Sequence, residues 1–128
     1  MKHSDSVVYT FINYFTGVEV ISNINEFSKL TKVSRGFMFK AISKYGKDYV
    51  LTNGWYIKGD SSSLEFSRYS NIWLHNGIVY ISGVKASVAS GVDREILKNP
   101  VTGIYPKGLR YLTFKDNKQE VGKLLGFL

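Results

Sequence analysis

Cysteine is absent from this sequence, which excludes disulfide bonds, thiolate metal sites and cysteine nucleophiles. Histidine is scarce: the two histidines, His3 and His75, lie far apart in the chain, and the acidic residues are scattered without the spacing of a two-metal site. Neither a G-x-x-x-x-G-K nor a G-x-G-x-x-G phosphate loop is present. We therefore expect no catalytic residue, no bound metal and no cofactor, and we do not expect an enzyme.

Long apolar segments are absent as well. No run approaches the roughly 18 residues that a membrane span requires, and the opening stretch MKHSDSVVY lacks the apolar core of a signal peptide. We therefore expect a soluble, cytoplasmic protein that has no membrane partner.

Acidic residues are outnumbered by basic ones. The 128 residues include 17 Lys and Arg against 10 Asp and Glu, which gives a formal net charge of +7. The excess is spread over both halves of the chain and is not confined to a tail, which favours a polyanionic partner such as nucleic acid. The alternative is a basic domain whose charge serves only solubility.

A short pattern occurs twice in the chain. The stretch YTFINYFTGVEVIS begins at Tyr9, and the stretch YSNIWLHNGIVYIS begins at Tyr69, 60 residues later. Since a chain of this length can bury one core or two small ones, we interpret the pattern as two copies of one unit. The residues of the first stretch that recur at this offset are Tyr9, Ile12, Gly17, Ile21 and Ser22.

Each copy opens with apolar residues that alternate around a turn, at Thr16-Gly17 in the first and at Asn76-Gly77 in the second, which predicts a β-hairpin. The apolar period then lengthens, which predicts two helices, and a closing strand follows. The expected fold class is α+β, as a tandem repeat of a small β-β-α-α-β unit. The repeats are expected at residues 1–60 and 61–115, with an amphipathic C-terminal helix at residues 116–128.

The helical part of the first copy has the pattern of a helix-turn-helix. Asn23 and Glu26 form a capping pair at the start of the first helix, and Ser34 is a good N-cap for the second. The apolar residues that we expect on the buried stripe of the first helix are Ile24, Phe27 and Leu30.

The second helix of the first copy divides into two arcs at about 100° per residue. The arc expected to face the core contains Phe37, Met38, Ala41, Ile42 and Tyr45. The opposite arc is basic and suits a helix in the major groove of DNA, where Lys and Arg reach phosphates and guanine edges, a small residue permits close approach and an aromatic ring meets a thymine methyl. The alternative is a solvated basic face with the aromatic residue packed in the core. The expected DNA contacts are Lys32, Ser34, Arg35, Gly36, Phe39, Lys40, Ser43, Lys44 and Lys47.

The second copy keeps only part of this pattern. Val84 and Val88 are expected to face inward, and Asp93 corresponds to Ser34 at an offset of 59, one residue fewer than in the strands. Pro100 ends the second helix early, because it disfavours a helical conformation at the residue before it. The expected DNA contacts of this shorter helix are Arg94, Lys98 and Asn99.

The tail DNKQEVGKLLGFL has helical spacing of its apolar residues. Such a helix either packs on its own domain or forms the contact of a homodimer, and both interpretations stay open. The apolar positions are Val121, Leu124, Leu125 and Leu128.

The stretch YTFINYFTGVEVISNINEFSKLTKVSRGFMFKAI resembles the nuclease-associated modular DNA-binding repeats (NUMOD type) that accompany homing endonucleases of phages and other mobile elements. Their pattern is an aromatic-rich strand, Thr-Gly, an apolar strand, and a helix-turn-helix with Val-Ser or Ile-Ser at the second helix. The resemblance covers about residues 8–58 well and residues 69–113 loosely, and it implies sequence-specific binding of double-stranded DNA. The residues that carry it are Tyr14, Thr16, Gly17, Ile21, Ser22, Phe27, Val33, Ser34, Ile42, Trp55 and Tyr56.

In that family the repeats sit beside a nuclease domain, and the sequence offers no such domain. Gly103-Ile104-Tyr105 matches half of a GIY-YIG motif without its partner, and His75 in LHNG lacks the second histidine of an HNH site. We therefore expect a phage or mobile-element protein that represses transcription by occupying an operator, in the cytoplasm of a bacterial host and associated with the nucleoid. The alternatives are a small phage inhibitor of a host protein and the DNA-targeting subunit of a separate nuclease.

Overall fold

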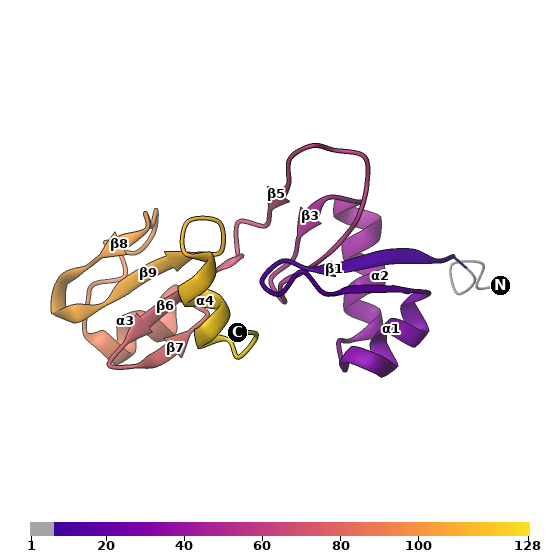
Figure 1. Ribbon diagram of the computed structural model, residues 1–128. Helices are drawn as coiled ribbons and strands as arrows, with labels where there is room; N and C mark the ends of the chain where they lie inside the picture. Colours follow the sequence, from indigo (N-terminus) through magenta and orange to yellow (C-terminus); the bar gives the residue numbers. More distant parts are fainter. Residues whose placement is uncertain (1–6) are drawn as a thin grey trace. The chain divides into compact units, whose positions relative to one another are not determined.

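The computed structural model describes residues 7–128 and shows an α+β fold (Figure 1). This part of the chain contains four α-helices and several short β-strands. It divides into two compact units, the first ending at Ser67 and the second running from Arg68 to Leu128. Among the helices described, none is both long enough and apolar enough to span a membrane.

The first unit is built on an antiparallel sheet with the order β2-β1-β4. It consists of β1 (Tyr9–Asn13), β2 (Glu19–Ser22) and β4 (Trp55–Ile57). The expected turn lies in a four-residue loop, in which the Asn13 side chain accepts hydrogen bonds from the amides of Phe15 (3.0 Å) and Thr16 (3.1 Å). Gly17 ends the loop with φ of 76°, a conformation that favours glycine.

Two helices follow the hairpin, α1 (Ile24–Thr31) and α2 (Arg35–Tyr45). The predicted caps are confirmed: Asn23 accepts a hydrogen bond from the amide of Glu26 at 2.8 Å, and Ser34 accepts one from the amide of Phe37 at 3.2 Å. Lys32 ends α1 in a left-handed conformation, with φ of 65°. The connection between the helices is thus three residues long, as the helix-turn-helix pattern predicts.

The core of the first unit lies between the sheet and the helices. Phe11 stacks on Phe27 with the ring centroids 3.9 Å apart, and Phe27 meets Trp55 edge to face. The expectation that Leu30 is buried was wrong, because α1 turns the side with Ile24 and Phe27 toward the sheet and leaves Leu30 68% exposed. On α2, Met38 and Ala41 are buried as expected, whereas Phe37 and Tyr45 lie at the rim of the buried side and are 39% and 38% exposed.

The segment after β4 remains attached to the first unit. β3 (Tyr49–Val50) pairs in parallel with β5 (Glu65–Phe66). The carboxylate of Asp48 accepts hydrogen bonds from the amides of Gly59 and Ser61, both at 2.9 Å. Backbone pairing and this carboxylate therefore hold residues 59–66 on the unit.

The second unit is built on an antiparallel sheet with the order β7-β6-β9-β8. It consists of β6 (Asn71–His75), β7 (Ile78–Tyr80), β9 (Arg110–Thr113) and β8 (Gly103–Ile104). Asn76 and Gly77 have φ of 50° and 78°, so the predicted two-residue hairpin is confirmed. Strand β8 lies at the edge of this sheet and contains Gly103 and Ile104, the first two residues of the GIY triplet.

One helix, α3 (Gly83–Ser90), covers this sheet, and the Ser82 side chain caps it by accepting a hydrogen bond from the amide of Lys85. The expectation that Val84 and Val88 face inward was wrong: they are 48% and 81% exposed, while Ala86 and Ser90 are buried. Small residues face the sheet because large aromatic side chains rise from it. The core of this unit consists of Trp73, Ala86, Val92, Leu97, Leu109 and Tyr111.

The expected second helix of the second unit does not form, so the prediction of a helix-turn-helix in residues 61–115 was wrong. After Gly91, the chain makes a single turn in which the amides of Ile96 and Leu97 bond to carbonyls three residues back, at 3.0 Å each. Pro100 prevents a helical continuation, and the buried Leu97 anchors the turn to the core. A 3₁₀ turn at Pro106–Gly108 then leads into β9.

The predicted C-terminal helix is present as α4 (Lys118–Leu124). Val121 is fully buried, and the Arg110 guanidinium makes two hydrogen bonds, of 2.5 and 2.8 Å, to the carboxylate of Glu120. α4 therefore packs on β9 of its own unit, as one of the two interpretations expects. Leu124 and Leu125 are half-buried, and Leu128 is exposed.

Candidate nucleic-acid interface

The exposed side of α2, together with the residues that flank the helix, carries most of the residues expected to contact DNA. Met38 and Ala41 turn the opposite side into the core, and the Ser34 cap fixes where the helix begins. Lys32 lies in the turn before the helix, and Lys47 follows the C-cap at Gly46. The expected contact residues that are exposed in this region are Lys32, Ser34, Arg35, Gly36, Lys40, Ser43, Lys44 and Lys47.

Phe39 is placed differently from the rest of this set. It is half-buried and packs against the core of the first unit, so the expectation of an exposed ring on the basic face was wrong. The Arg35 guanidinium carbon lies 5.0 Å from the centroid of this ring, within the range of a cation–π contact. Phe39 therefore supports Arg35 at the edge of the exposed side, as the core alternative anticipates.

The electrostatics of this face are one-sided. Between residues 24 and 47 the only acidic residue is Glu26, and it forms an exposed ion pair with Lys29 at 3.7 Å. Asp48 comes next in the chain, but it is buried and bonded to backbone amides. In the described residues, no carboxylate forms an ion pair with Lys32, Lys40 or Lys47. The face thus presents ammonium groups without local neutralisation.

An aromatic pair at the end of α2 was missed by sequence reasoning. Tyr45 and Tyr49 stack in parallel with their ring centroids 4.2 Å apart, and the Lys44 ammonium lies 5.2 Å from the centroid of Tyr45. The spacing of four residues was a usable signal, but Gly46 ends the helix between the two rings. The two stacked tyrosine rings and the Lys44 ammonium therefore continue the exposed surface of α2 beyond the end of the helix.

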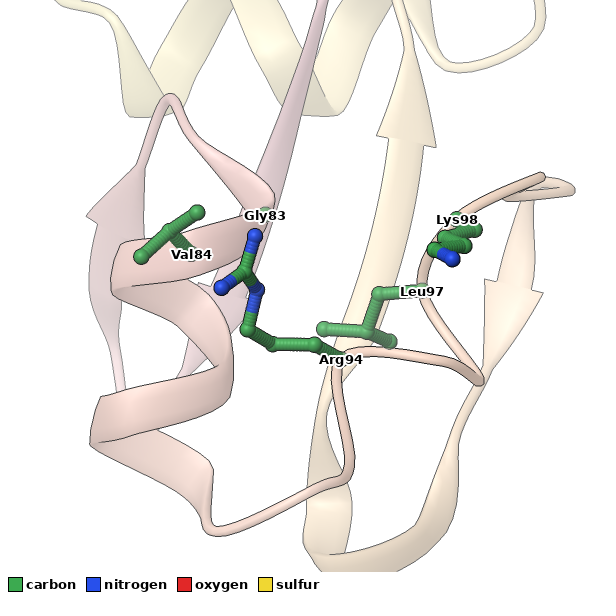
Figure 2. A pocket seen from close by; sticks show the side chains of 5 residues that line it. All are labelled: Gly83, Val84, Arg94, Leu97 and Lys98. Carbon is green, nitrogen blue, oxygen red and sulfur yellow. The ribbon is translucent and has the colours of Figure 1, made fainter.

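The second unit brings two of its three expected residues together, although not on a helix. Arg94 and Lys98 line a hollow of about 190 Å³ beside the start of α3, with Leu97 between them (Figure 2). Lys98 also forms an exposed ion pair with Glu95 at 3.1 Å. Asn99 is exposed but does not line this hollow.

Groups with perturbed acidity lie away from α2 in the described part of the chain. Burial, and then the charges of Asp48 and Glu19, raise the pKa of the Tyr56 hydroxyl. The hydrogen bond from Arg110 lowers the pKa of Glu120, and the same bond raises the pKa of Arg110. Residues 7–128 hold no cluster of three or more His, Asp or Glu that could bind a metal ion.

Comparison of the chain with protein-family models, with curated proteins and with solved structures gives no match. Function is therefore inferred from the geometry and the charges of the chain itself.

Proposed function

We propose that the chain is a sequence-specific double-stranded DNA-binding protein, in which α2 of the first unit enters the major groove. The observation that carries this proposal is the exposed side of α2, which is basic and has no acidic residue. An α-helix fits the width of the major groove, and Lys and Arg there meet both phosphates and guanine edges. Gly36, near the start of the helix, permits close approach of the backbone.

The two units are, in this proposal, copies of one module of which only the first kept its recognition helix. In both, a hairpin is followed by a capped helix, and the hairpin's first strand pairs with the closing strand. The resemblance of residues 8–58 to nuclease-associated DNA-binding repeats supports the same interpretation. Base reading is then assigned to α2, and the second unit adds affinity.

The biological role proposed is repression by occupancy, in a phage or another mobile element. A protein that covers an operator excludes polymerase without any chemistry. Specific affinities of about 10⁻⁸ to 10⁻¹¹ M are typical of such proteins. A footprint that overlaps a promoter, paired with a reporter driven from it, tests this role, and unchanged reporter output would contradict it.

The DNA-binding proposal is tested by selecting bound fragments from random and genomic DNA and measuring affinity by fluorescence anisotropy. Lys40→Ala and Arg35→Ala are each expected to weaken specific binding by about 1–3 kcal/mol if the side chains reach base edges. Lys58→Ala is the matched control, because this exposed lysine follows β4 in the same unit and lies off α2. Equal losses in all three variants would contradict base reading by α2, and a chain that binds no duplex would contradict DNA binding itself.

Salt dependence separates this proposal from docking on an acidic protein. Each lysine or arginine that neutralises a phosphate releases counterions, so the logarithm of the affinity falls steeply with the logarithm of the salt concentration. We expect Lys40→Ala to reduce this slope by about one. A slope near zero on the selected DNA would argue against the proposal.

A further inference from the structure

The start of α3 borders two hollows that share part of their lining. The hollow of about 190 Å³ shares Gly83, Val84, Leu97 and Lys98 with a neighbouring one of about 300 Å³. The larger hollow is also lined by Arg68, Trp73 and Tyr111, among others. We call the two together the α3 pocket, and all its residues belong to the second unit.

Trp73 offers this pocket a hydrogen-bond donor that has no partner. The residue is only 3% exposed, and its indole N–H forms no hydrogen bond in the structure. Its Nε1 lies 3.9 Å from the point where a side chain at Gly83 would begin, so the nitrogen lies beside the start of α3. This nitrogen is not among the buried polar atoms that lack a partner in the described residues, so it is open to the hollow, where a ligand can accept its hydrogen bond.

Tyr111 adds a second donor, whose hydroxyl is likewise not among the enclosed polar atoms that lack a partner in the described residues. It is 5% exposed and lines the same pocket, and its hydroxyl has no hydrogen-bond partner in the structure. Burial, and then the neighbouring Tyr105, raise the pKa of this hydroxyl, so it keeps its proton at neutral pH. The hydroxyl therefore stays a donor.

The cations at the pocket complete a set of donors. Figure 2 shows the Arg94 guanidinium beside Gly83 at the start of α3, and within residues 7–128 no carboxylate forms an ion pair with Arg94. Arg68 and Lys98 line the larger hollow. No Asp or Glu lines either hollow, and the nearby Glu95 is paired with Lys98 at the surface. A ligand here meets N–H, O–H and cationic groups, which suits an oxyanion.

We propose that the α3 pocket binds a phosphate group, and that on DNA it takes one phosphate of the backbone. The placement of a DNA backbone phosphate in the pocket rests on the proposed function, whereas the binding of a free phosphate does not. A backbone phosphate carries position and no base identity. The second unit would thus fix the register of the chain on the duplex, and α2 would read the sequence.

The experiment uses the full chain and follows the two indole N–H resonances by NMR while inorganic phosphate replaces chloride at constant ionic strength. Trp73 reports the pocket, and Trp55 in the core of the first unit is the internal control. We expect a saturable shift of the Trp73 resonance and none of Trp55. An unchanged Trp73 resonance at all phosphate concentrations would overturn the proposal.

Two variants localise the anion. Arg94→Gln removes an exposed cation and is expected to weaken phosphate binding at least about tenfold, and Lys115→Gln, which removes an exposed cation of the same unit away from the pocket, is expected to change nothing. Gly83→Ala places a methyl group in ordinary contact distance of the indole nitrogen and is expected to weaken binding while α3 stays folded. An Arg94→Gln response equal to that of Lys115→Gln would overturn the assignment.

The same resonance then separates the two sources of phosphate. When the selected duplex is added, a shift of Trp73 in the same direction supports seating of a backbone phosphate. Duplex binding without any change at Trp73 would overturn that seating and leave the proposed DNA binding intact. A response to inorganic phosphate in a chain that binds no duplex would support the pocket as a site for a free phosphate, and the proposed function would fail separately.

Discussion

Each unit packs a helix on a sheet, and the two units differ in which of these elements supplies the large side chains of the contact. In the first, both the helix and the sheet supply a large side chain, because Phe27 stacks on Phe11 of the central strand. In the second, the strand supplies it, because Trp73 fills the space above the sheet and the helix contributes Ala86. The helix α1 therefore packs on its sheet through its own aromatic side chain, Phe27. The helix α3 instead packs through the small Ala86 against Trp73 of the sheet.

In the proposed tandem repeat, strand pairing sets which positions of the two units correspond. Phe11 pairs with Val20 and Ile57, and Trp73 pairs with Tyr80 and Tyr111. The offset between the units is therefore 62 in the first strand, 60 in the second strand and 59 at the helix caps, Asn23 and Ser82.

The comparison of the two cores is tested most strongly by deletion of the large helical residue. Phe27→Ala should destabilise the first unit by about 3–5 kcal/mol, because it opens a cavity among Phe11 and Trp55. Leu30→Ala on the same helix should cost under about 0.5 kcal/mol, since this side chain is exposed. Denaturant titrations followed at the Trp55 indole resonance measure both. Similar losses in the two variants would contradict the observed orientation of α1.

The next effect concerns the segment that follows β4. A side chain at Gly59 would begin 2.4 Å from Asp48 Oδ2 and 2.8 Å from the Cβ of Lys47, so Gly59→Ala should break the hydrogen bonds of the carboxylate. We expect a loss of about 1–3 kcal/mol. Gly36→Ala is the control, because its new methyl would lie 3.9 Å from the nearest atom and in a helix it should be stabilising by up to about 1 kcal/mol. Thermal unfolding of the two variants gives the comparison, and a tolerated Gly59→Ala would contradict the clash.

Local signals in the sequence predicted local structure well. The caps at Asn23 and Ser34 and the Asn76-Gly77 hairpin are decided by residues close in the chain, and each is confirmed. The basic side of α2 was also found this way, since it depends on helical spacing around Met38 and Ala41.

Tertiary packing accounts for what the sequence could not show. The match of Tyr9 to Tyr69 assumed equal hairpin loops, but the first loop has four residues and the second has two, which shifts the first strands by two positions. Val84 and Val88 were assigned inward because the space that Trp73 occupies is not visible in a helical pattern. The α3 pocket was missed for the same reason, since its residues come from four separate segments of the second unit, 68–73, 81–84, 94–100 and 111.

The smallest predicted effect concerns the ion pair that joins α4 to β9, for which the first unit has no counterpart in the described residues. Arg110 holds the pKa of Glu120 below its usual value, mainly through the hydrogen bond. A carboxyl whose folded pKa is lowered contributes stability above its unfolded pKa and loses that contribution as the pH falls through the folded pKa. Since both side chains are more than a third exposed, Glu120→Gln should cost under about 1 kcal/mol at pH 7.

The pH dependence of this variant tests the origin of that small difference. Unfolding of the second unit, followed at the Trp73 indole resonance, should show wild type and Glu120→Gln converging as the pH is lowered below the folded pKa of Glu120. The Trp55 resonance should report equal stability of the first unit in both proteins at every pH. A difference that persists in acid would mean that Glu120 stabilises α4 through packing or helix capping and not through its charge.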